Sequence, residues 1–269
     1  MSNELRAYID TWWQAVGEFA DLAESLADAD WARPTDLPGW DVRAVVSHVA
    51  HLEGILGGAP REEAEVGPAA HVRGPMGQFT EIGVLTRRHT SPGEIVEQIR
   101  HYAAARHDAL LADLPTDPSA PAPGVFGAIG WDVRRLLRNR PLDVWMHEQD
   151  VRRAVGRPGG LGSPAAEHSV TYLLESLGYV LAKRVGAAPG TTVVALVEGS
   201  PPAAYGVGAD GRGQRLDTPP AEPTTTLRMS RDTFVRLAGG RGHVDPDAVT
   251  IEGDVALGEK IAASLAVTP

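Results

Sequence analysis

The spacing of apolar residues changes from a helical period to a strand period along this chain of 269 residues. Up to residue 155 the apolar positions recur at helical spacing, whereas between residues 191 and 252 they form short runs separated by turn residues. The segment 156–163, Gly-Arg-Pro-Gly-Gly-Leu-Gly-Ser, is rich in turn-forming residues and divides the two patterns. We therefore predict an α+β protein of two domains: a helical domain over residues 1–158 and a small α+β domain over residues 159–269.

The helical domain is expected to be a four-helix bundle, a fold that builds metal and cofactor sites between facing helices. The predicted helices are 3–28, 41–57, 92–114 and 131–155. Pro141 interrupts the last of them and should either kink it or begin a new helix. The two long connections, 58–90 and 115–130, are rich in glycine or proline and are predicted to be irregular, with the first long enough to cover a site.

The second domain is predicted to mix helices with short strands. Ser163 and Pro164 have the character of an N-cap and a first helical residue, and Asp210-Gly211 is typical of a hairpin turn. The predicted helices are 164–185, 232–239 and 254–266, and the predicted strands are 191–197, 203–207, 214–216, 224–229 and 248–252.

Charge and hydropathy exclude several classes of protein. The formal net charge is −10, which argues against a general affinity for nucleic acid or an anionic membrane. No apolar run approaches the roughly 20 residues that span a bilayer, and the first residues do not have the basic and apolar segments of a secretory signal. We expect a cytoplasmic protein.

The chain has no cysteine, which excludes thiolate metal sites and a protein thiol nucleophile. Any metal must therefore be bound by nitrogen and oxygen, and any thiol chemistry requires a sulfur from a small molecule. Seven of the nine histidines precede residue 156, so the chemistry is expected in the bundle. They are His48, His51, His71, His89, His101, His107 and His147.

The last helix of the bundle carries a candidate pair of metal ligands. Asp143 and His147 are four residues apart, and together with Asp150 they fall in a sector of roughly 60° flanked by apolar residues. Glu148 and Gln149 fall on the opposite side, where water is expected. A lone pair at this spacing is more often part of a solvated face, but buried carboxylates would need a cation or donors.

A second helix offers a third ligand. His48 is bracketed by Val45, Leu52 and Leu56 and so is expected to face inward. A lone histidine on an apolar face is more often a satisfied core residue, but two inward faces with ligand types favour a site of His48, Asp143 and His147. His51 lies about 60° round the helix from His48 and is a fallback ligand or a group that supports the ligands.

Two further motifs need interpretation. The segment that starts at His147-Glu148 does not contain the second histidine of the H-E-x-x-H motif, so a zinc protease is rejected. Arg241 follows two glycines after the predicted helix 232–239. Such an arginine either clamps a carboxylate or phosphate through its two-pronged side chain or is an exposed loop residue, and both readings remain open.

Three motifs resemble the mycothiol-dependent maleylpyruvate isomerase family over nearly the whole chain. They are the T-x-x-P-G-W turn at 35–40 that precedes His48, the D-V-W-M-H-E-Q-D-V-R segment at 143–152, and the L-A-G-G-R segment at 237–241 with Gly253-Asp254. The resemblance implies a DinB-like four-helix bundle and a C-terminal domain similar to sterol carrier proteins.

The resemblance also implies a divalent metal, usually zinc, held by His48, Asp143 and His147. Asp150 corresponds to an aspartate near that site, and Arg241 to an arginine that would bind the substrate. In the isomerase that this chain resembles, a glutamate stands at the position of Asp143, and Pro141 is unusual in that helix.

Three functions are compatible with these features. The favoured one is a metal-dependent and mycothiol-dependent isomerase or thiol transferase that acts on a small electrophile, as a monomer or homodimer, without nucleic acid or membrane partners. The second is a hydrolase that uses metal-bound water. The third is a non-catalytic ligand-binding or stress-associated module.

Overall fold

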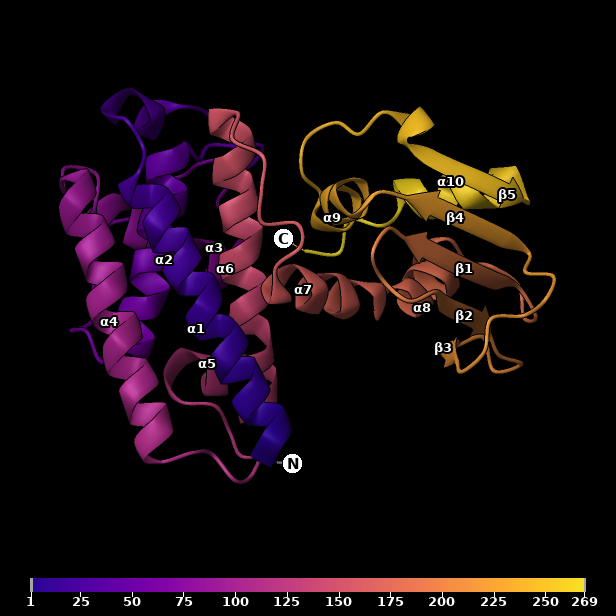
Figure 1. The fold of residues 1–269 in the computed structure, drawn as a ribbon, viewed down its shortest axis with the longest axis horizontal. Helices are drawn as coiled ribbons and strands as arrows, with labels where there is room; N and C mark the ends of the chain where they lie inside the picture. The colour runs from indigo at the N-terminus through magenta and orange to yellow at the C-terminus, as the bar shows by residue number, and fades with distance from the viewer. Residues whose placement is uncertain (1, 269) are drawn as a thin grey trace. The chain divides into compact units, whose positions relative to one another are not determined.

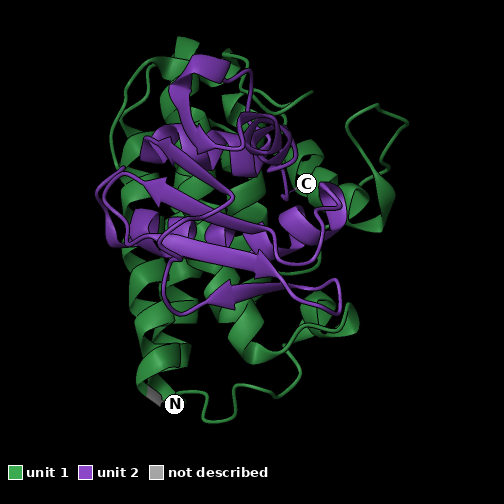
Figure 2. Cartoon of the chain, turned by 90° about the vertical axis from the view of Figure 1, so that its right-hand side faces the viewer, with its two compact units in different colours: residues 1–160 green, residues 161–269 purple. Residues whose placement is uncertain are grey.

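The computed structural model describes residues 2–268 and divides into two compact units, residues 1–160 and 161–269 (Figure 2). The first unit is helical and the second combines helices with a five-stranded sheet, so the predicted α+β class is confirmed. Within residues 2–268 we find no helix with the length and apolar character needed to cross a membrane.

The first unit is a four-helix bundle, as predicted. Its long helices are α1 (Ser2–Glu24), α2 (Val42–Leu56), α4 (Pro92–Ala112) and α6 (Val133–Val155) (Figure 1). Helices α1 and α2 each pack against both α4 and α6, which closes the bundle around one core. The core side chains with almost no exposure include Leu5, Ile9, Phe19, Val45, Val49, Ile95, Ile99, Val144 and Trp145.

Side-chain caps fix where the helices that carry the candidate ligands begin. The Asp41 carboxylate accepts a hydrogen bond from the Ala44 backbone N–H at 2.8 Å at the start of α2, and Asp132 does the same for Arg135 at 2.7 Å at the start of α6. Helix α6 then runs without a break through Pro141, so the proline does not begin a new helix. Asp143 and His147 therefore lie in the middle of a long helix.

The connection 58–90, predicted to be irregular, contains a further helix, α3 (Gly74–Thr86), which packs on α2. Its glycines weaken the helical pattern in the sequence, yet Gly83 is required by packing: a Cβ at this position would lie 2.2 Å from the Cβ of His51. The second connection, 115–130, likewise contains a short helix, α5 (Gly124–Ala128). Both loop predictions were wrong for these segments.

The second unit is a mixed sheet with helices. The strands are β1 (Thr192–Val197), β2 (Ala203–Val207), β3 (Gly213–Leu216), β4 (Thr225–Met229) and β5 (Val249–Gly253). Their order is β3-β2-β1-β4-β5, and β1 with β4 is the parallel pair. The helices are α7 (Pro164–Leu174), α8 (Leu177–Tyr179), the π-helical turn Val180–Arg184, α9 (Arg231–Gly239) and α10 (Val255–Ala263). Ser163 caps α7, and the predicted strands match within about a residue.

Candidate metal centre

The structure brings His48 of α2 together with Asp143 and His147 of α6. One side-chain nitrogen or oxygen from each residue lies within 4.8 Å of the others. His48 Nε2 is 3.8 Å from Asp143 Oδ2, and His147 Nε2 is 3.8 Å from Asp143 Oδ1. The two imidazole rings meet edge to face with centroids 4.7 Å apart. Both histidines are buried, while the Asp143 side chain is 24% exposed, so the cluster lies at the edge of the core.

The donor set fits a divalent ion such as zinc. Ligands about 2.1 Å from a zinc ion lie roughly 3.4–3.6 Å from each other. The two distances from Asp143 to the histidines, 3.8 Å each, are slightly longer, and no pair of donor atoms is more than 4.8 Å apart, so the donors need to move only a little to bind the ion. The donors are two imidazoles and one carboxylate, the ligand types of a catalytic zinc site with a position left for water or substrate. The nitrogen of His48 that faces Asp143 is Nε2, whereas Nδ1, on the other side of the ring, is buried without a hydrogen-bond partner within residues 2–268.

The protonation states also suit a metal. Burial lowers the pKa of His48 to about 4, against the opposing effect of its contact with Asp143, so the ring is neutral at neutral pH. Burial acts to raise the pKa of Asp143, but the positive charge of Arg140 and the contact with His48 outweigh it and hold that pKa well below its usual range. At neutral pH the cluster therefore offers a neutral imidazole and an ionised carboxylate.

Asp150, predicted to lie near the ligands, contacts His147 directly. Its Oδ2 is 3.2 Å from His147 Nδ1, and its Oδ1 accepts a hydrogen bond from Arg153 at 2.7 Å. A carboxylate on one ring nitrogen fixes the histidine tautomer and orients the other nitrogen, as is typical around metal-bound histidines. Asp150 is fully buried, and this arrangement directs His147 Nε2 toward Asp143.

Trp40 packs against both histidines. Its ring centroid is 5.0 Å from that of His48 and 6.2 Å from that of His147. The indole Nε1 donates to Glu81 Oε2 of α3 at 3.0 Å, and His71 Nε2 lies 3.3 Å from the same oxygen. The connection 58–90, which is long enough to cover a site, thus reaches the cluster through Trp40.

His51 does not belong to the three-residue cluster. Its Nδ1 lies 2.7 Å from Glu62 Oε2, and Arg87 also donates to this carboxylate. Burial acts to raise the pKa of Glu62, but the hydrogen bonds from His51 and Arg87 outweigh it and lower that pKa to about 2. His51 therefore fastens the segment that contains Glu62 to α2.

Arg241 belongs to the unit of residues 161–269 and is 6% exposed. Its guanidinium donates to the backbone oxygen of Gly239 and lies 3.4 Å from the hydroxyl of Thr268. The reading of an exposed loop arginine is wrong, because these contacts with the chain around it bury the side chain. Its role in substrate binding stays a prediction.

The side of α6 that carries Glu148 and Gln149 was expected to face water, and this is wrong. Glu148 is fully buried and Gln149 is 3% exposed. Gln149 donates to the Gly159 oxygen at 3.1 Å, Trp145 donates to the Gly160 oxygen at 3.1 Å, and Arg152 pairs with Glu148 at 2.6 Å. The glycine-rich segment after α6 therefore folds back over this side of the helix.

Sequence reasoning missed the buried charges behind Asp143. Arg140 donates to Asp143 Oδ2 at 2.8 Å and to Glu53 Oε1 at 2.6 Å, and both Arg140 and Glu53 are almost completely buried. One signal was available: Glu53 follows Val46 and Val49 by seven and four residues, which places it on an apolar side of α2. A carboxylate on that side requires a buried cation.

A four-helix bundle with a cluster of nitrogen and oxygen donors, followed by a small α+β unit, defines a class of two-domain proteins with a candidate metal centre. The family model described as the mycothiol maleylpyruvate isomerase N-terminal domain matches residues 12–152, and the one described as the MDMPI C-terminal domain matches residues 167–260. The chain belongs to the mycothiol-dependent maleylpyruvate isomerase family.

Two solved structures share the fold. A crystal structure of a mycothiol-dependent maleylpyruvate isomerase is 18% identical, with a TM-score of 0.56, and the match covers 93% of this chain and 94% of that one. The structure of a histidine-to-alanine mutant of such an isomerase gives 18% identity, a TM-score of 0.54 and the same coverage. A comparison with curated proteins finds no match.

Proposed function

We propose that this protein is a metal-dependent enzyme that uses mycothiol to act on a small electrophilic substrate, as an isomerase or thiol transferase. The observation that carries the proposal is the cluster of His48, Asp143 and His147, whose donor atoms lie within 4.8 Å of each other in a chain of this family. The fold and the matched family domains support it.

In this proposal the three residues hold a divalent ion, most suitably zinc. Neutral His48 and ionised Asp143 are in the protonation states that a metal requires, and Asp150 holds His147 in one tautomer. The bound metal would lower the pKa of a thiol and so favour its thiolate at neutral pH. Because the chain has no cysteine, this thiol must come from a small molecule, and the family of the chain makes mycothiol the one we propose.

The isomerisation needs no oxidant and no net consumption of thiol. Mycothiol would supply a thiolate that adds to one carbon of a conjugated cis double bond, with the electron pair of the double bond accepted by the adjacent carbonyl group. After rotation the same thiolate would be released and the double bond restored as trans, so the atoms and electrons balance. Arg241 is proposed to hold a carboxylate of the substrate through its guanidinium.

Metal analysis provides the first test. Purified wild-type protein should contain about one zinc ion per chain after loading and desalting, and His48→Ala should contain far less. His89→Ala is the control, because His89 is exposed and lies outside the cluster. Equal, stoichiometric zinc in wild type and His48→Ala would refute the assignment of the ligands.

Thiol dependence of turnover separates the proposed function from the two alternatives. An isomerase or transferase should convert electrophiles such as conjugated cis diacids only when mycothiol is added. Turnover with metal but without thiol would instead identify a hydrolase that uses bound water. No turnover in either assay, together with a metal that only raises the melting temperature, would identify a binding module.

A further inference from the structure

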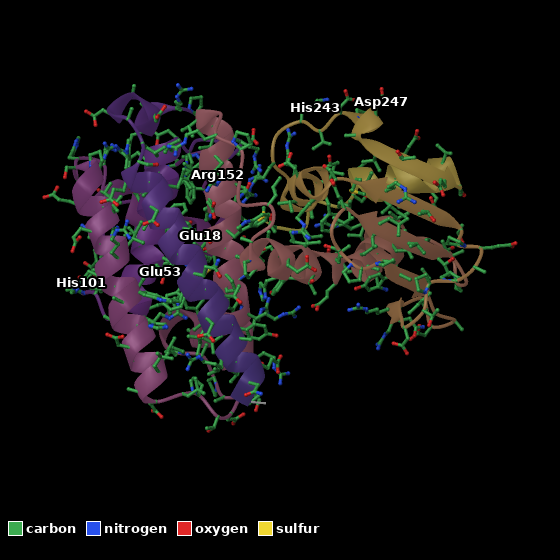
Figure 3. The ribbon with its side chains drawn as sticks, in the orientation of Figure 1. Glu18, Glu53, His101, Arg152, His243 and Asp247 are labelled. Carbon is green, nitrogen blue, oxygen red and sulfur yellow. The ribbon has the colours of Figure 1, made fainter. Side chains whose placement is uncertain are left out.

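A single buried carboxylate on one helix of the bundle contacts the three other helices. Glu53 of α2 is fully buried, and its Oε1 accepts hydrogen bonds from Trp12 of α1 at 3.1 Å and from Arg140 of α6 at 2.6 Å. Its Oε2 lies 3.7 Å from Nη1 of Arg106 on α4, whose guanidinium stacks over the Trp12 ring at 4.5 Å. Figure 3 shows Glu53 among these helices.

The contacts of Glu53 lead directly to a candidate metal ligand. Arg140 is 1% exposed and uses its two terminal nitrogens on two different carboxylates: Nη2 on Glu53 and Nη1 on Asp143. The guanidinium group of arginine is planar and rigid, so a hydrogen bond at one terminal nitrogen restricts the direction of the other. The position of Glu53 therefore sets the angle at which Arg140 holds Asp143 Oδ2.

We propose that Glu53 is a positioning residue of the metal centre that acts through Arg140 on Asp143. The inference rests on the proposed function, because it presupposes a metal at His48, Asp143 and His147. The hydrogen bond from Arg140 restricts rotation of the short Asp143 side chain, so that Asp143 is held for the metal before the metal binds.

The balance of buried charges also indicates that Glu53 supports metal binding at Asp143. Arg106, Glu53, Arg140 and Asp143 form a chain of alternating charges that sums to zero. If Glu53 becomes neutral, two buried guanidinium groups lose their shared counter-charge, and Arg140 interacts more strongly with Asp143. The additional positive charge repels a divalent cation, and the tighter pair with Arg140 competes for the carboxylate.

A purely structural role for Glu53 makes a different prediction, and the chain offers a matched control. Glu148 is also fully buried, is paired with an arginine at 2.6 Å, and also has an Oε2 atom without a hydrogen-bond partner within residues 2–268. It is adjacent to His147 in sequence, but its partner Arg152 is not hydrogen-bonded to a candidate ligand. Loss of either carboxylate should lower stability, whereas only loss of Glu53 should change metal affinity.

The experiment measures zinc affinity by competition with a chromophoric chelator for the full-length wild type, Glu53→Gln and Glu148→Gln, with thermal melts of the metal-free proteins alongside. Glu53→Gln should weaken zinc binding about 10-fold to 100-fold, in the range known for groups that orient metal ligands, and Glu148→Gln should change it less than about twofold. Equal zinc affinity in wild type and Glu53→Gln would overturn the inference and leave the proposed function standing. Failure of wild type to bind zinc would overturn both.

Arg140→Lys separates positioning from charge and also serves if Glu53→Gln does not fold. Lysine retains the positive charge, but its ammonium group cannot reproduce the planar fork that joins two carboxylates. Zinc affinity should fall about 10-fold in Arg140→Lys if the fork positions Asp143. Affinity equal to that of wild type in this variant would overturn the positioning role, whatever the behaviour of Glu53→Gln.

Discussion

The two units of the chain differ in what they bury. The described part of residues 1–160 buries nine ionisable side chains: His48, His51, Glu53, Arg87, Arg106, Arg140, His147, Glu148 and Asp150. In the described part of residues 161–269 the buried residues with a polar side-chain group are five with a hydroxyl and one arginine: Ser169, Tyr205, Thr225, Thr226, Thr233 and Arg241. The apolar cores are of the same kind, so the difference lies in charge.

Buried charges are costly unless they are paired, and breaking a buried pair leaves an uncompensated charge in the core. In the bundle they form connected sets around the candidate ligands, such as Glu53 with Arg140 and Asp150 with His147. The second unit instead presents an ordinary α+β core. The comparison teaches that the bundle depends on its internal ion pairs, and that substitutions of equal chemistry should have unequal effects in the two units.

The largest effect is expected for an arginine that bridges a fully buried carboxylate and a partly exposed one. Arg140→Met leaves Glu53 without its closest cation in the core and should destabilise the bundle by about 3–5 kcal/mol. The comparable change in the second unit is Arg231→Met, which removes a pair with Glu167, a side chain that is 44% exposed, and hydrogen bonds to the Leu161 and Gly199 oxygens. It should cost only about 2 kcal/mol, because water can solvate Glu167 once the arginine is gone.

The sequence offers a separate probe for the bundle, because all six tryptophans precede residue 161. They are Trp12, Trp13, Trp31, Trp40, Trp131 and Trp145. Urea unfolding followed by tryptophan fluorescence therefore measures the bundle, and hydrogen exchange of α7 and the strands measures the second unit. Similar losses for the two arginine variants would contradict the comparison.

Metal removal should act on the bundle alone. A metal that binds only the folded protein, present at 100 times its dissociation constant, stabilises by about 2.7 kcal/mol. Treatment with a chelator should therefore lower the urea concentration at the midpoint of the unfolding transition detected by tryptophan fluorescence. Hydrogen exchange in residues 161–269 should not change. Re-addition of zinc should restore the transition in wild type but not in His147→Ala, and recovery in that variant would argue against His147 as a ligand.

The sequence predicted the elements of both units because apolar spacing, caps and turn residues are local signals. Asp41 and Ser163 mark helix starts in the sequence and in the structure, and α3 was missed because Gly77 and Gly83 weaken its pattern. The apolar flanks of His48 and Asp143 likewise predicted their inward faces.

Contacts between residues far apart in the sequence could not be predicted from local sequence patterns. Nothing in the pattern around Glu148 indicated that residues 159–160 return to cover it, because that contact depends on the path of the chain after α6. The pairing of Glu53 with Arg140 joins residues 87 apart, and its prediction requires the packing of α2 on α6. Burial of charge is decided by tertiary structure, so the sequence located the ligands better than the groups behind them.

Glu62 provides a pH-dependent test within the bundle. Its pKa in the folded protein is about 2, below the value of about 4.3 expected in the unfolded chain, so its ionised form contributes stability above pH 4.3. That contribution is lost as the pH falls from about 4.3 through about 2. Glu62→Gln should cost about 2 kcal/mol at neutral pH, and the difference from wild type should shrink as the solution is acidified toward pH 2.

Urea unfolding at a series of pH values measures this difference. Glu97→Gln is a useful control for the loss of one negative charge, because Glu97 is exposed on the surface of α4. A Glu62→Gln deficit that stays constant from neutral pH to pH 2 would show that the contacts of Glu62 do not depend on its charge.

The smallest loss of stability is expected when a helix N-cap is removed, and this loss should be equal in the two units. It therefore tests whether the greater sensitivity of the bundle is limited to its buried ion pairs. Asp132 caps α6 of the bundle by accepting from Arg135 N–H at 2.7 Å, and Asp254 caps α10 of the second unit by accepting from Leu257 N–H at 2.9 Å. Both caps lie outside the buried charge network, and each alanine substitution removes one hydrogen bond to a helix end. Asp132→Ala and Asp254→Ala should each cost about 1 kcal/mol. Hydrogen exchange at the first turns of α6 and α10 would measure both, and a cost several times larger in the bundle would mean that its sensitivity is general and does not arise from its buried ion pairs.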